Sequence, residues 1–518
     1  MTEITTELKE VPGIDVPNDL FISTDFKMNP DILKEEPQPQ PSLGYSDELN
    51  NAKKKITPHV AKWDSSVKFL LSDFELVDIY RNPKYSHQRY NEPIIKYRSK
   101  MDSDQSKGVY PIFSRAYFKL WEVLENTHIL DRFKDTPLTF GCVAEGPGGF
   151  MHCLIDNRKK QNGADWNKDE YYSITLKIGE GNDAKALDWD HFKSKEYFEY
   201  IKGKGYNVNL SYGEDNTGNM FNLKNLTYFV EKDLGNKKCQ LVTGDGGIDL
   251  TSDEEFDIQE LVNAPLFFAE ILYCFHIQET NGSFILKIYD IYYNVTVQLI
   301  LLLKLFYEKV RIVKPHTSRP ASSEKYLDCE GSKGASEEQL HVLRDILYEW
   351  VGKSGGWNGL DKSTFAERII QFNIDEAKIE AFRSELAKFN GIFFESQVSK
   401  ITKGLELCSK GFIPKDDIMK IKKQQKDIAI AWCEKHGMPY NPDLVLQETA
   451  TKAIGPGGNN QRGANNRSDG HWRKNDERDR NRGDRGDRGD RGDNWRRNDS
   501  RNDGRNFRRD DYSRGRRD

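Results

Sequence analysis

The chain has 518 residues, of which 36% are hydrophobic and 31% are charged, and its formal net charge is −5. This length predicts two or three folded pieces, and the large charged fraction predicts solvated segments beside them. The seven cysteines are scattered and have no CxxC pair or other metal-ligand spacing, which is typical of reduced thiols in an intracellular protein. A polar, acidic beginning and the shortness of the longest apolar run, 295–306, argue against a secreted protein and against a membrane protein.

The first part of the chain divides into two stretches of different composition. Residues 1–55 are rich in Pro, Asp, Glu and Asn and have no sustained apolar period, so we expect a mostly disordered N-terminal arm. From residue 56 to residue 101 apolar residues become denser, as in VKFLLSDFELVDIY, which predicts one or two helices packed on the following domain.

A helix is predicted over 113–124, because its apolar side chains recur at steps of three and four. These side chains are Tyr117, Leu120, Trp121 and Leu124. Lys119 lies about 100° from Leu120 on the helix surface, off the apolar stripe, where a lysine is ordinarily solvated. The helical pattern alone therefore assigns Lys119 no function.

A glycine-rich turn follows the next predicted element. The apolar run 138–144 has the composition of a buried strand, and Phe150 begins a predicted helix. The residues between them are Glu145, Gly146, Pro147, Gly148 and Gly149. A strand, a glycine-rich turn and a helix start bring the backbone close to a ligand, although an ordinary βα turn has the same pattern.

Strands alternate with helices through the middle of the chain. Predicted strands cover 171–176, 207–212, 240–243, 282–289 and 310–314, with a last one after a polar loop, and predicted helices cover 261–278 and 295–307. This alternation predicts a mostly parallel sheet with helices on both faces. We therefore interpret 138–331 as a doubly wound, Rossmann-like α/β domain with an antiparallel last hairpin.

Two polar residues stand out in this domain. Asp245 follows strand 240–243 between glycines, at the strand end where open α/β sheets bind ligands, although an ordinary turn aspartate explains the same pattern. Lys287 lies within an otherwise apolar strand, where an ammonium must be paired, neutral or at a sheet edge.

The remainder of the chain differs in character. Ser336 and Gln339 form a predicted capping box, and further helical stretches cover 364–372, 375–389 and 415–435, so we expect an all-α helical appendix over 336–453. The tail, 454–518, is rich in Arg, Gly and Asp, cannot bury enough apolar area to fold, and is predicted to be disordered. Its arginines and spaced aromatic residues favour contact with nucleic acid, which the interleaved aspartates weaken.

Several of these motifs, in this order, resemble the FtsJ-like (RrmJ) ribose 2′-O-methyltransferases, and more closely their Adrift-type branch, which acts on the cap of mRNA. The resemblance covers roughly 109–331. EGPGGF resembles the S-adenosylmethionine loop of that family, SRAYFKL its first catalytic helix, and LKIY the strand with its catalytic lysine. TSRPASSEKY is the most specific match, and Thr175-Leu176-Lys177 with Asn182-Asp183 also resembles the branch.

Carried over by position, the resemblance implies a site and a cofactor. The catalytic set of the family falls on Lys119, Asp245, Lys287 and Glu324. The S-adenosylmethionine-binding residues would be Glu145, Gly146, Pro147, Gly148, Gly149, Phe150, Asn219, Met220 and Asp245. Cys142 stands where other members have an acidic residue, so the cofactor role of Glu145 is the weakest part of this assignment. The resemblance implies an FtsJ-like methyltransferase domain over 56–335, with a helical lead-in and without a metal.

These residues carry the groups that methyl transfer to a ribose hydroxyl requires. A ribose hydroxyl is a weak nucleophile, so methyl transfer needs a base within hydrogen-bond reach. Lys287 can be that general base if burial and neighbouring cations, Lys119 and the sulfonium, lower its pKa. Asp245 can then orient Lys287, and Glu324 can orient Lys119 and the hydroxyl.

The resulting expectation is methyl transfer from S-adenosylmethionine to the ribose 2′-OH of a cap-proximal nucleotide of mRNA. The partners would be capped RNA and other capping or transcription components, and the location would be intracellular: cytoplasmic in a virus, nuclear in a cell. The alternatives are a ribose 2′-O-methyltransferase of rRNA or tRNA, and a non-catalytic RNA-binding scaffold. The scaffold predicts a damaged catalytic set, whereas all four residues are present.

Overall fold

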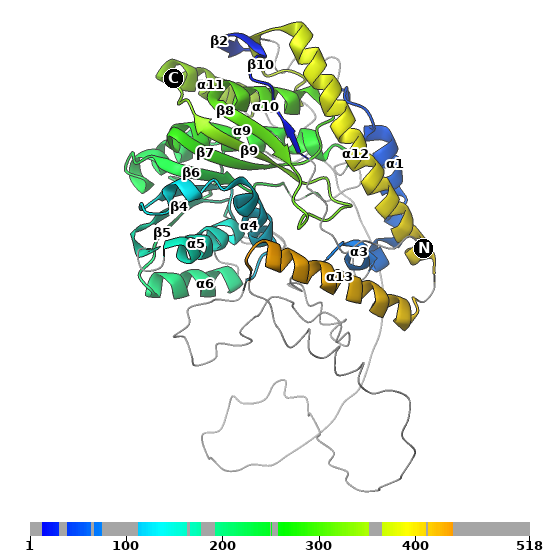
Figure 1. The fold of residues 1–518 in the computed structure, drawn as a ribbon. Coiled ribbons are helices and arrows are strands. Elements are labelled where there is room, and N and C mark those ends of the chain that lie inside the picture. The colour runs from blue at the N-terminus through cyan, green and yellow to red at the C-terminus, as the bar shows by residue number, and fades with distance from the viewer. Residues whose placement is uncertain are drawn as a thin grey trace, which may run out of the picture. The chain divides into compact units, whose positions relative to one another are not determined.

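The computed structural model of the protein describes residues 13–30, 39–63, 67–74, 112–162, 166–177, 192–248, 250, 257–351, 365–410 and 413–438. The chain divides into two compact units, 1–454 and 455–518, and every described residue belongs to the first (Figure 1). The predicted disordered tail and the Asn182-Asp183 match lie outside the described residues, as does most of the lead-in beyond residue 74.

The centre of the first unit is an eight-stranded sheet with the order β1-β8-β9-β7-β6-β3-β4-β5. The strands are β1 Gly13–Asp15, β3 Thr139–Val143, β4 Glu170–Ile174, β5 Asn207–Ser211, β6 Cys239–Gly244, β7 Gln278–Ile288, β8 Tyr307–Val313 and β9 Lys325–Ser332. Strands β3 to β7 are parallel, while β9 runs antiparallel between β7 and β8. The expected Rossmann-like sheet with an antiparallel last hairpin is confirmed.

Helices cover both faces of this sheet because its buried strands are apolar on both sides. Alternate residues of each strand enter different cores: Val143, Val242 and Leu286 join one, and Cys142, Leu241 and Ile285 join the other. Helices of the first core include α7 Leu223–Tyr228, α9 Gln259–Ile277, α10 Asn294–Phe306 and α11 Glu337–Trp350. Helices of the second core include α4 Ala116–Thr127, α5 Gly149–Asn162 and α6 Phe192–Gly203. In Figure 1, α10 and α11 lie above the sheet and α5 and α6 below it.

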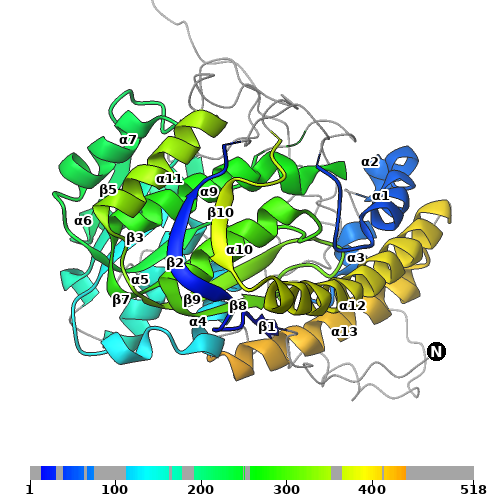
Figure 2. The same ribbon diagram turned by 90° about the horizontal axis from the view of Figure 1, so that it is seen from above.

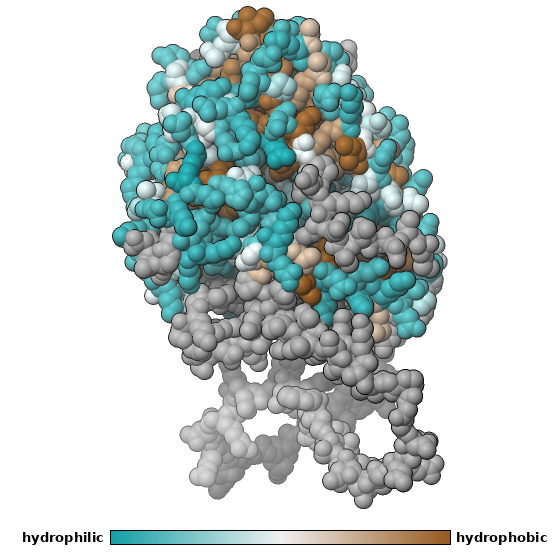
Figure 3. Space-filling model, viewed as in Figure 1, coloured by the Kyte–Doolittle hydropathy of each residue, from teal (hydrophilic) through white to brown (hydrophobic). Residues whose placement is uncertain are grey.

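Helix α9 is long and apolar enough to cross a membrane, but 89% of that apolar window is buried inside the fold. Such burial is ordinary for the core helix of a large α/β domain, where sheet and neighbouring helices cover it on all sides. On the view in Figure 3 the outer surface is mainly hydrophilic, with small separate apolar patches.

The N-terminal segment is a correction to the expected disordered arm. Strand β1 pairs antiparallel with β8 at the sheet edge, and β2, Phe21–Met28, pairs antiparallel with β10, Ile370–Ile374. The ring of Phe26 packs against Phe306 and Phe372, with centroids 6.0 and 6.4 Å apart. The prediction from composition failed because each strand pairs with a segment hundreds of residues away. The local sequence therefore contains no apolar period that indicates a strand.

The lead-in consists of short helices. They are α2 Val60–Lys62, α3 Lys68–Leu71 and a 3₁₀ turn, Thr57–His59. Helix α1, Ser46–Lys54, precedes them and lies in the expected disordered arm, which it corrects further. Figures 1 and 2 show α1 lying alongside α12, Glu376–Ser409. Further 3₁₀ turns cover Asp131–Phe133 and Trp166–Lys168, and a π-helical turn, Phe229–Asp233, continues α7.

The segment after residue 335 is helical but not all-α. Helix α11 begins with the predicted capping box, in which Ser336 and Gln339 hydrogen-bond reciprocally. The predicted helix 364–372 is wrong, because residues 365–369 are not helical and β10 begins at Ile370. Helix α13, Lys415–Lys435, has the predicted bounds.

Helix α12, Glu376–Ser409, has 34 residues and continues well beyond its predicted end at residue 389. Asn390 and Gly391, which follow that predicted end, make packing contacts within the fold. The amide of Asn390 donates to the carbonyl of Ile291 at 2.6 Å, and Gly391 leaves room for the ring of Tyr45. A polar residue followed by glycine thus marks a close approach between elements instead of a helix terminus.

Candidate active site

The strand order reverses between β3 and β6, which makes the carboxyl ends of these strands a topological switch point where doubly wound sheets bind ligands. The glycine-rich turn follows β3, Asp245 follows β6, and Lys287 lies near the end of β7. β7 lies between β6 and β9, so Lys287 is not on an edge strand. The sheet therefore brings three predicted segments to one edge.

Lys119 and Glu324 form a close ion pair at this edge. The Lys119 Nζ lies 2.7 and 2.6 Å from the two carboxylate oxygens, and the hydroxyl of Tyr326 also donates to Glu324 Oε1. The Lys119 side chain is only 16% exposed, so it is not a solvated surface lysine. Burial opposes the charge on Glu324, but Lys119 and Lys287 outweigh it and lower the pKa of this carboxyl to about 2.

Lys287 is held by Asp245 in two ways. Its Nζ lies 3.1 Å from Asp245 Oδ1 and donates to the Asp245 backbone carbonyl at 2.6 Å. Burial favours the neutral amine, but Asp245, Tyr289 and Glu324 outweigh it, and the pKa of Lys287 is raised above its ordinary value. The lowering expected from burial, Lys119 and the sulfonium does not occur in the contacts of the protein alone. Burial raises the pKa of Asp245, while Lys287 and Lys119 oppose the rise.

The glycine turn is organised by Glu145. This carboxyl is 2% exposed, and its Oε1 accepts the backbone N–H groups of Phe150 and Met151, at 2.7 and 3.0 Å, in the first turn of α5. An acidic group at a helix N-terminus is favourable because it meets unpaired N–H groups there. Glu145 Oε2 is also buried and has no hydrogen-bond partner among the described residues. Burial, with Asp245 adding to it, raises the pKa of Glu145.

The other turn residues shape the loop through their backbone. The N–H of Gly146 donates to Thr175 Oγ1 at 2.9 Å, and the peptide between Gly146 and Pro147 is cis. Gly148 has φ +107°, which favours glycine, and a Cβ on Gly149 would lie 2.7 Å from Ser114 Oγ. The ring of Phe150 is fully buried.

The segment with Asn219 and Met220 lies against the end of β4, next to the glycine turn. Gly218 has φ +68°, and a Cβ there would overlap the carbonyl oxygen of Thr175. The Asn219 side chain accepts the N–H of Phe221 at 3.0 Å, while Met220 is buried in the core. The structure therefore brings both predicted cofactor segments to Thr175, although the Met220 side chain faces inward.

The sequence comparison agrees with this geometry. The family model described as FtsJ-like methyltransferase matches residues 112–332, from just before α4 to the end of β9. We refer to residues 112–332, which this model matches, as the FtsJ-like domain.

Relatives of the FtsJ-like domain include proteins named cap-specific mRNA (nucleoside-2′-O-)-methyltransferase. The protein of this name numbered 1A from Caenorhabditis briggsae is 28% identical over 278 residues, 53% of this chain and 29% of its own. Those numbered 1 from Xenopus laevis and Homo sapiens are each 32% identical, over 40% and 41% of this chain and 23% of their own. The chain thus spans less than a third of the length of these relatives.

A solved structure, human methyltransferase-like protein 13 in complex with SAH, is 12% identical and covers 48% of this chain and 93% of that chain with a TM-score of 0.26. This likeness is too low to carry an argument. The fold class rests on the strand order and the parallel pairing of β3 to β7 described above.

A buried carboxylate that sequence reasoning missed joins the FtsJ-like domain to α13. Glu122 Oε1 accepts the N–H of His316 at 2.8 Å, and Oε2 accepts from the Thr317 N–H and hydroxyl and from Trp432 Nε1, at 2.9–3.1 Å. Burial opposes ionisation, but the hydrogen bonds from His316 outweigh it and lower the pKa of Glu122. A spacing of three places Glu122 on the same face of α4 as Lys119, and that spacing is the signal available in the sequence.

Two further polar residues shape the loops of the site. The buried Lys314 ammonium donates to Ser318 Oγ, Ser322 O and Glu324 O, at 3.1, 2.6 and 2.9 Å, so the loop before β9 folds around it. Burial, with Lys325 adding to it, lowers the pKa of Lys314 to about 7. Asp215 similarly collects the Thr217 N–H and hydroxyl beside Gly218, at 3.0 and 2.6 Å.

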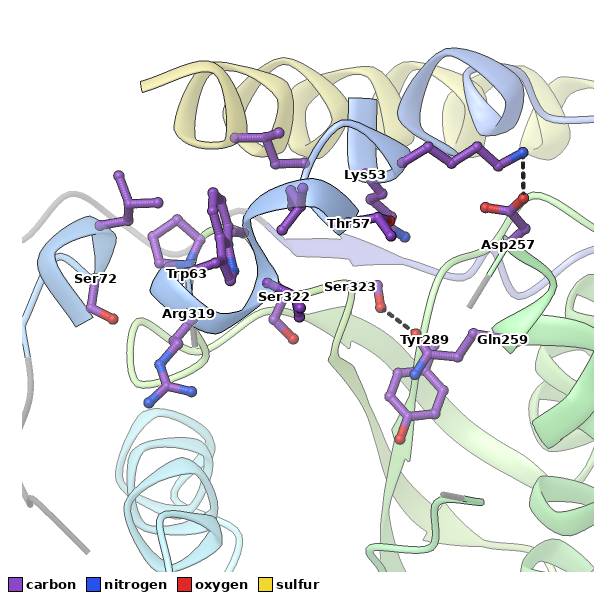
Figure 4. A pocket seen from close by; sticks show the side chains of 17 residues that line it. Lys53, Thr57, Trp63, Ser72, Asp257, Gln259, Tyr289, Arg319, Ser322 and Ser323 are labelled. Atoms are coloured by element: carbon purple, nitrogen blue, oxygen red, sulfur yellow. Dashed lines mark hydrogen bonds and ion pairs between the residues drawn. The ribbon is translucent and has the colours of Figure 1, made fainter. Parts of the chain in front are cut away.

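A cavity of about 510 Å³ lies beside the predicted catalytic set (Figure 4). It is lined by the end of α1, by the loop 319–323 and by Tyr289. Further lining residues include Ile56, Thr57, Val60, Trp63, Leu71 and Ser72. Figure 4 shows Trp63 and Arg319 on one side and Gln259 and Tyr289 on the other. The Lys287 Nζ lies 5.9 Å from the Tyr289 ring centroid, so the cavity and the Lys287 site share a wall. Part of its lining comes from outside the FtsJ-like domain.

Proposed function

We propose that this chain transfers a methyl group from S-adenosylmethionine to the ribose 2′-hydroxyl of a cap-proximal nucleotide of mRNA. The main support for the proposal is the placement of two ion pairs, Lys119–Glu324 and Lys287–Asp245, at the switch point of an FtsJ-like domain. The names of the relatives supply the substrate class. Capped RNA and components of capping or transcription are the partners that this function implies, in an intracellular setting.

The residues around the glycine turn fit the cofactor. Glu145 Oε2 is a buried acceptor without a described partner, which suits the ammonium of an amino-acid moiety. The turn from Gly146 to Gly149 permits close approach of a ligand to the backbone, and the Gly218 loop lies next to it across Thr175. Bound there, S-adenosylmethionine supplies an electrophilic methyl group activated by its sulfonium.

Lys119, Glu324, Lys287 and Asp245 have different roles in the transfer. Lys119, fixed by Glu324, donates a hydrogen bond to the ribose oxygen and orients it. Lys287 would accept the proton of the 2′-hydroxyl as the oxygen–carbon bond forms and the methyl carbon–sulfur bond breaks, with the thioether as leaving group, and would then release the proton to solvent. Alignment of the hydroxyl oxygen with the methyl carbon contributes much of the acceleration.

The raised pKa of Lys287 sets a condition on this mechanism. In the described contacts Lys287 holds its proton, so it cannot accept another. A positive charge brought within a few ångströms, as the sulfonium of the bound cofactor would be, lowers the pKa of an ammonium. Lys287 therefore becomes a base only in the assembled complex.

The acceptor RNA is proposed to enter beside Tyr289. The cavity there is bordered by Arg319, whose cationic group suits a phosphate. A nucleotide in the cavity would leave its neighbouring ribose near Lys287, across the Tyr289 wall. Residues of α1 and the Trp63 region would then contribute to RNA binding although they lie outside the matched family region.

The experiment is methyl transfer from radiolabelled S-adenosylmethionine to one short RNA, prepared with and without a cap, followed by nuclease mapping of the label. Label on a ribose next to the cap, dependent on the cap, is the expected result. Label inside uncapped RNA would move the function to ribose methylation of rRNA or tRNA. An absence of label on both RNAs, with RNA binding retained, would favour the scaffold.

A further inference from the structure

Glu270 is a fully buried carboxyl on α9 that the mechanism above does not use. It lies beneath the turn that carries Asp245, and its Oε1 accepts the backbone N–H of Gly246 at 2.8 Å. Its Oε2 is also buried and has no hydrogen-bond partner among the described residues. Burial of a carboxyl costs free energy, so its retention beneath this turn indicates a specific role.

Glu270 and Lys287 bind opposite ends of one peptide group. The N–H of Gly246, which donates to Glu270, and the carbonyl of Asp245, which accepts from Lys287 Nζ at 2.6 Å, belong to the peptide unit between these two residues. Hydrogen bonds in such a chain polarise and orient one another. Only three backbone atoms, the Gly246 nitrogen and the Asp245 carbonyl carbon and oxygen, separate the two hydrogen bonds. The position of the Glu270 carboxyl therefore affects the position of the Lys287 ammonium.

The glycines on either side of Asp245 make room for this carboxyl. A Cβ on Gly244 or on Gly246 would lie 2.8 Å from Glu270 Oε1. Real Cβ atoms do not approach an oxygen so closely, and the fully buried Glu270 cannot swing away into solvent. The Gly-Asp-Gly sequence is therefore explained by the packing of Glu270 under the turn.

The electrostatic setting couples the same groups. Burial raises the pKa of Glu270 to about 8; the Gly246 N–H and Lys287 oppose the rise, and Asp245 adds to it. The carboxyl of Glu270 thus responds to both members of the Lys287–Asp245 pair.

We propose that Glu270 is a positioning residue for the methyl transfer: it holds the Asp245–Gly246 peptide so that the carbonyl and the carboxylate of Asp245 clamp Lys287 together. This inference rests on the proposed function, because the clamp matters only if Lys287 takes part in the reaction. Glu270 itself touches neither the acceptor nor the methyl group in this account.

The matched control lies on the same helix. Glu260 is also buried on α9, accepts two backbone N–H groups, from Tyr292 and Tyr293 at 2.8 and 3.0 Å, and has its pKa raised by burial to about 8. It supports the turn after β7 instead of the turn that carries Asp245. Its loss should therefore cost stability without loosening Lys287.

The first readout is steady-state methyl transfer by the full chain. Glu270→Leu should lower kcat by about tenfold to a hundredfold with little change in KM, as expected for misplacement of a reacting group. Glu270→Gln, whose amide oxygen can still accept from Gly246, should recover most of the rate. Glu260→Leu should keep the kcat of its folded fraction.

The second readout does not need methyl transfer. Acylation of Lys287 by an amine-reactive reagent, followed by mass spectrometry and normalised to the exposed Lys309, should be several-fold faster in Glu270→Leu than in the wild type or Glu260→Leu. If the wild type transfers no methyl group, the proposed function fails while this measurement still tests the clamp. Wild-type kcat together with wild-type acylation in Glu270→Leu would overturn the inference.

A second variant serves if Glu270→Leu does not fold. Gly246→Ala places a methyl group 2.8 Å from the Oε1 position and must push the Glu270 carboxyl away from the turn. It should reproduce both the loss of kcat and the faster acylation of Lys287. Wild-type values for both in Gly246→Ala would equally overturn the positioning role.

Discussion

Lys119 on α4 and Glu324 before β9 are 205 residues apart in the chain, yet their Nζ and Oε2 atoms meet at 2.6 Å. Both side chains are largely buried, so the pair has lost most of its contact with water. A desolvated ion pair is expensive to form unless each charge keeps further partners. The hydroxyl of Tyr326 and the nearby Lys287 are those partners of Glu324.

Glu324→Gln should therefore change how stability depends on pH. The folded-state pKa, about 2, lies below the unfolded value, so the carboxylate stabilises the fold above the unfolded pKa and this stabilisation is lost as the pH falls towards 2. The variant should be less stable at pH 7 by about 1–3 kcal/mol and should lose less stability than the wild type on acidification. Urea unfolding at pH 7, 4 and 3 measures both effects, and parallel pH curves for the two proteins would contradict them.

Lys314→Met should remove a pH dependence of the same sign that lies at higher pH. The folded-state pKa of Lys314, about 7, lies below that of an unfolded lysine, so between pH 7 and 10 the unfolded chain binds more protons and wild-type stability rises with pH. We expect a rise on the order of 1 kcal/mol per pH unit from this residue. Urea unfolding of both proteins at pH 7 and 9 tests it; equal slopes would show that the Lys314 pKa is not lowered.

Gly218→Ala should weaken cofactor binding. The added Cβ overlaps the Thr175 carbonyl, so the loop must move away from the end of β4 and from the glycine turn. We expect affinity for S-adenosylmethionine to fall by about tenfold or more, corresponding to at least 1.4 kcal/mol. Isothermal titration calorimetry gives the Kd.

Gly235→Ala is the control for Gly218→Ala. Gly235 also has a positive φ, +59°, but an added Cβ there meets open space. It should cost about 1 kcal/mol of stability through backbone strain alone, with an unchanged Kd. Equal Kd values for Gly218→Ala and the wild type would contradict the assignment of this loop.

Trp432→Phe should lower activity from a distance. The substitution keeps an aromatic ring on α13 but removes the N–H that donates to Glu122, which leaves that buried carboxylate short of a donor. We expect a loss of about 1–2 kcal/mol in the free energy of unfolding and a reduced kcat, because Glu122 also holds the loop of His316 and Thr317.

Trp121→Phe separates these two effects. The Trp121 Nε1 donates to the carbonyl of His436, so this change loosens the same α4–α13 contact without touching Glu122. It should reduce stability by a similar amount and leave kcat closer to the wild type. If both variants lower kcat equally, the Glu122 network has no special part in the site.

The sequence was most informative where structure is local. The bounds of α13, the capping box of α11 and the hairpin of β8 and β9 follow from periodicity and turn residues over a few positions. The strands β2 and β10 were not predicted, because each is stabilised by a partner more than 300 residues away. Periodicity and residue propensity depend only on neighbouring residues and cannot indicate such pairing.

The site divides in the same way. Periodicity gave Lys119 no function, and only its match to a family motif suggested one; the fold then supplied Glu324 as its partner. Glu270 could not be recognised from its neighbours, because its role depends on a turn 24 residues earlier that passes over it. The direction of the Lys287 pKa was also beyond the sequence, since it depends on whether carboxylates or cations lie closer to the ammonium.

The most direct test of the account compares Lys287→Ala with Lys309→Ala, an exposed lysine of β8, in methyl transfer to capped RNA. S-adenosylmethionine binding and thermal unfolding are measured on the same preparations. We expect Lys287→Ala to bind the cofactor and fold but to transfer no methyl group, whereas Lys309→Ala should transfer at the wild-type rate. Retained methyl transfer in Lys287→Ala would contradict the proposed mechanism.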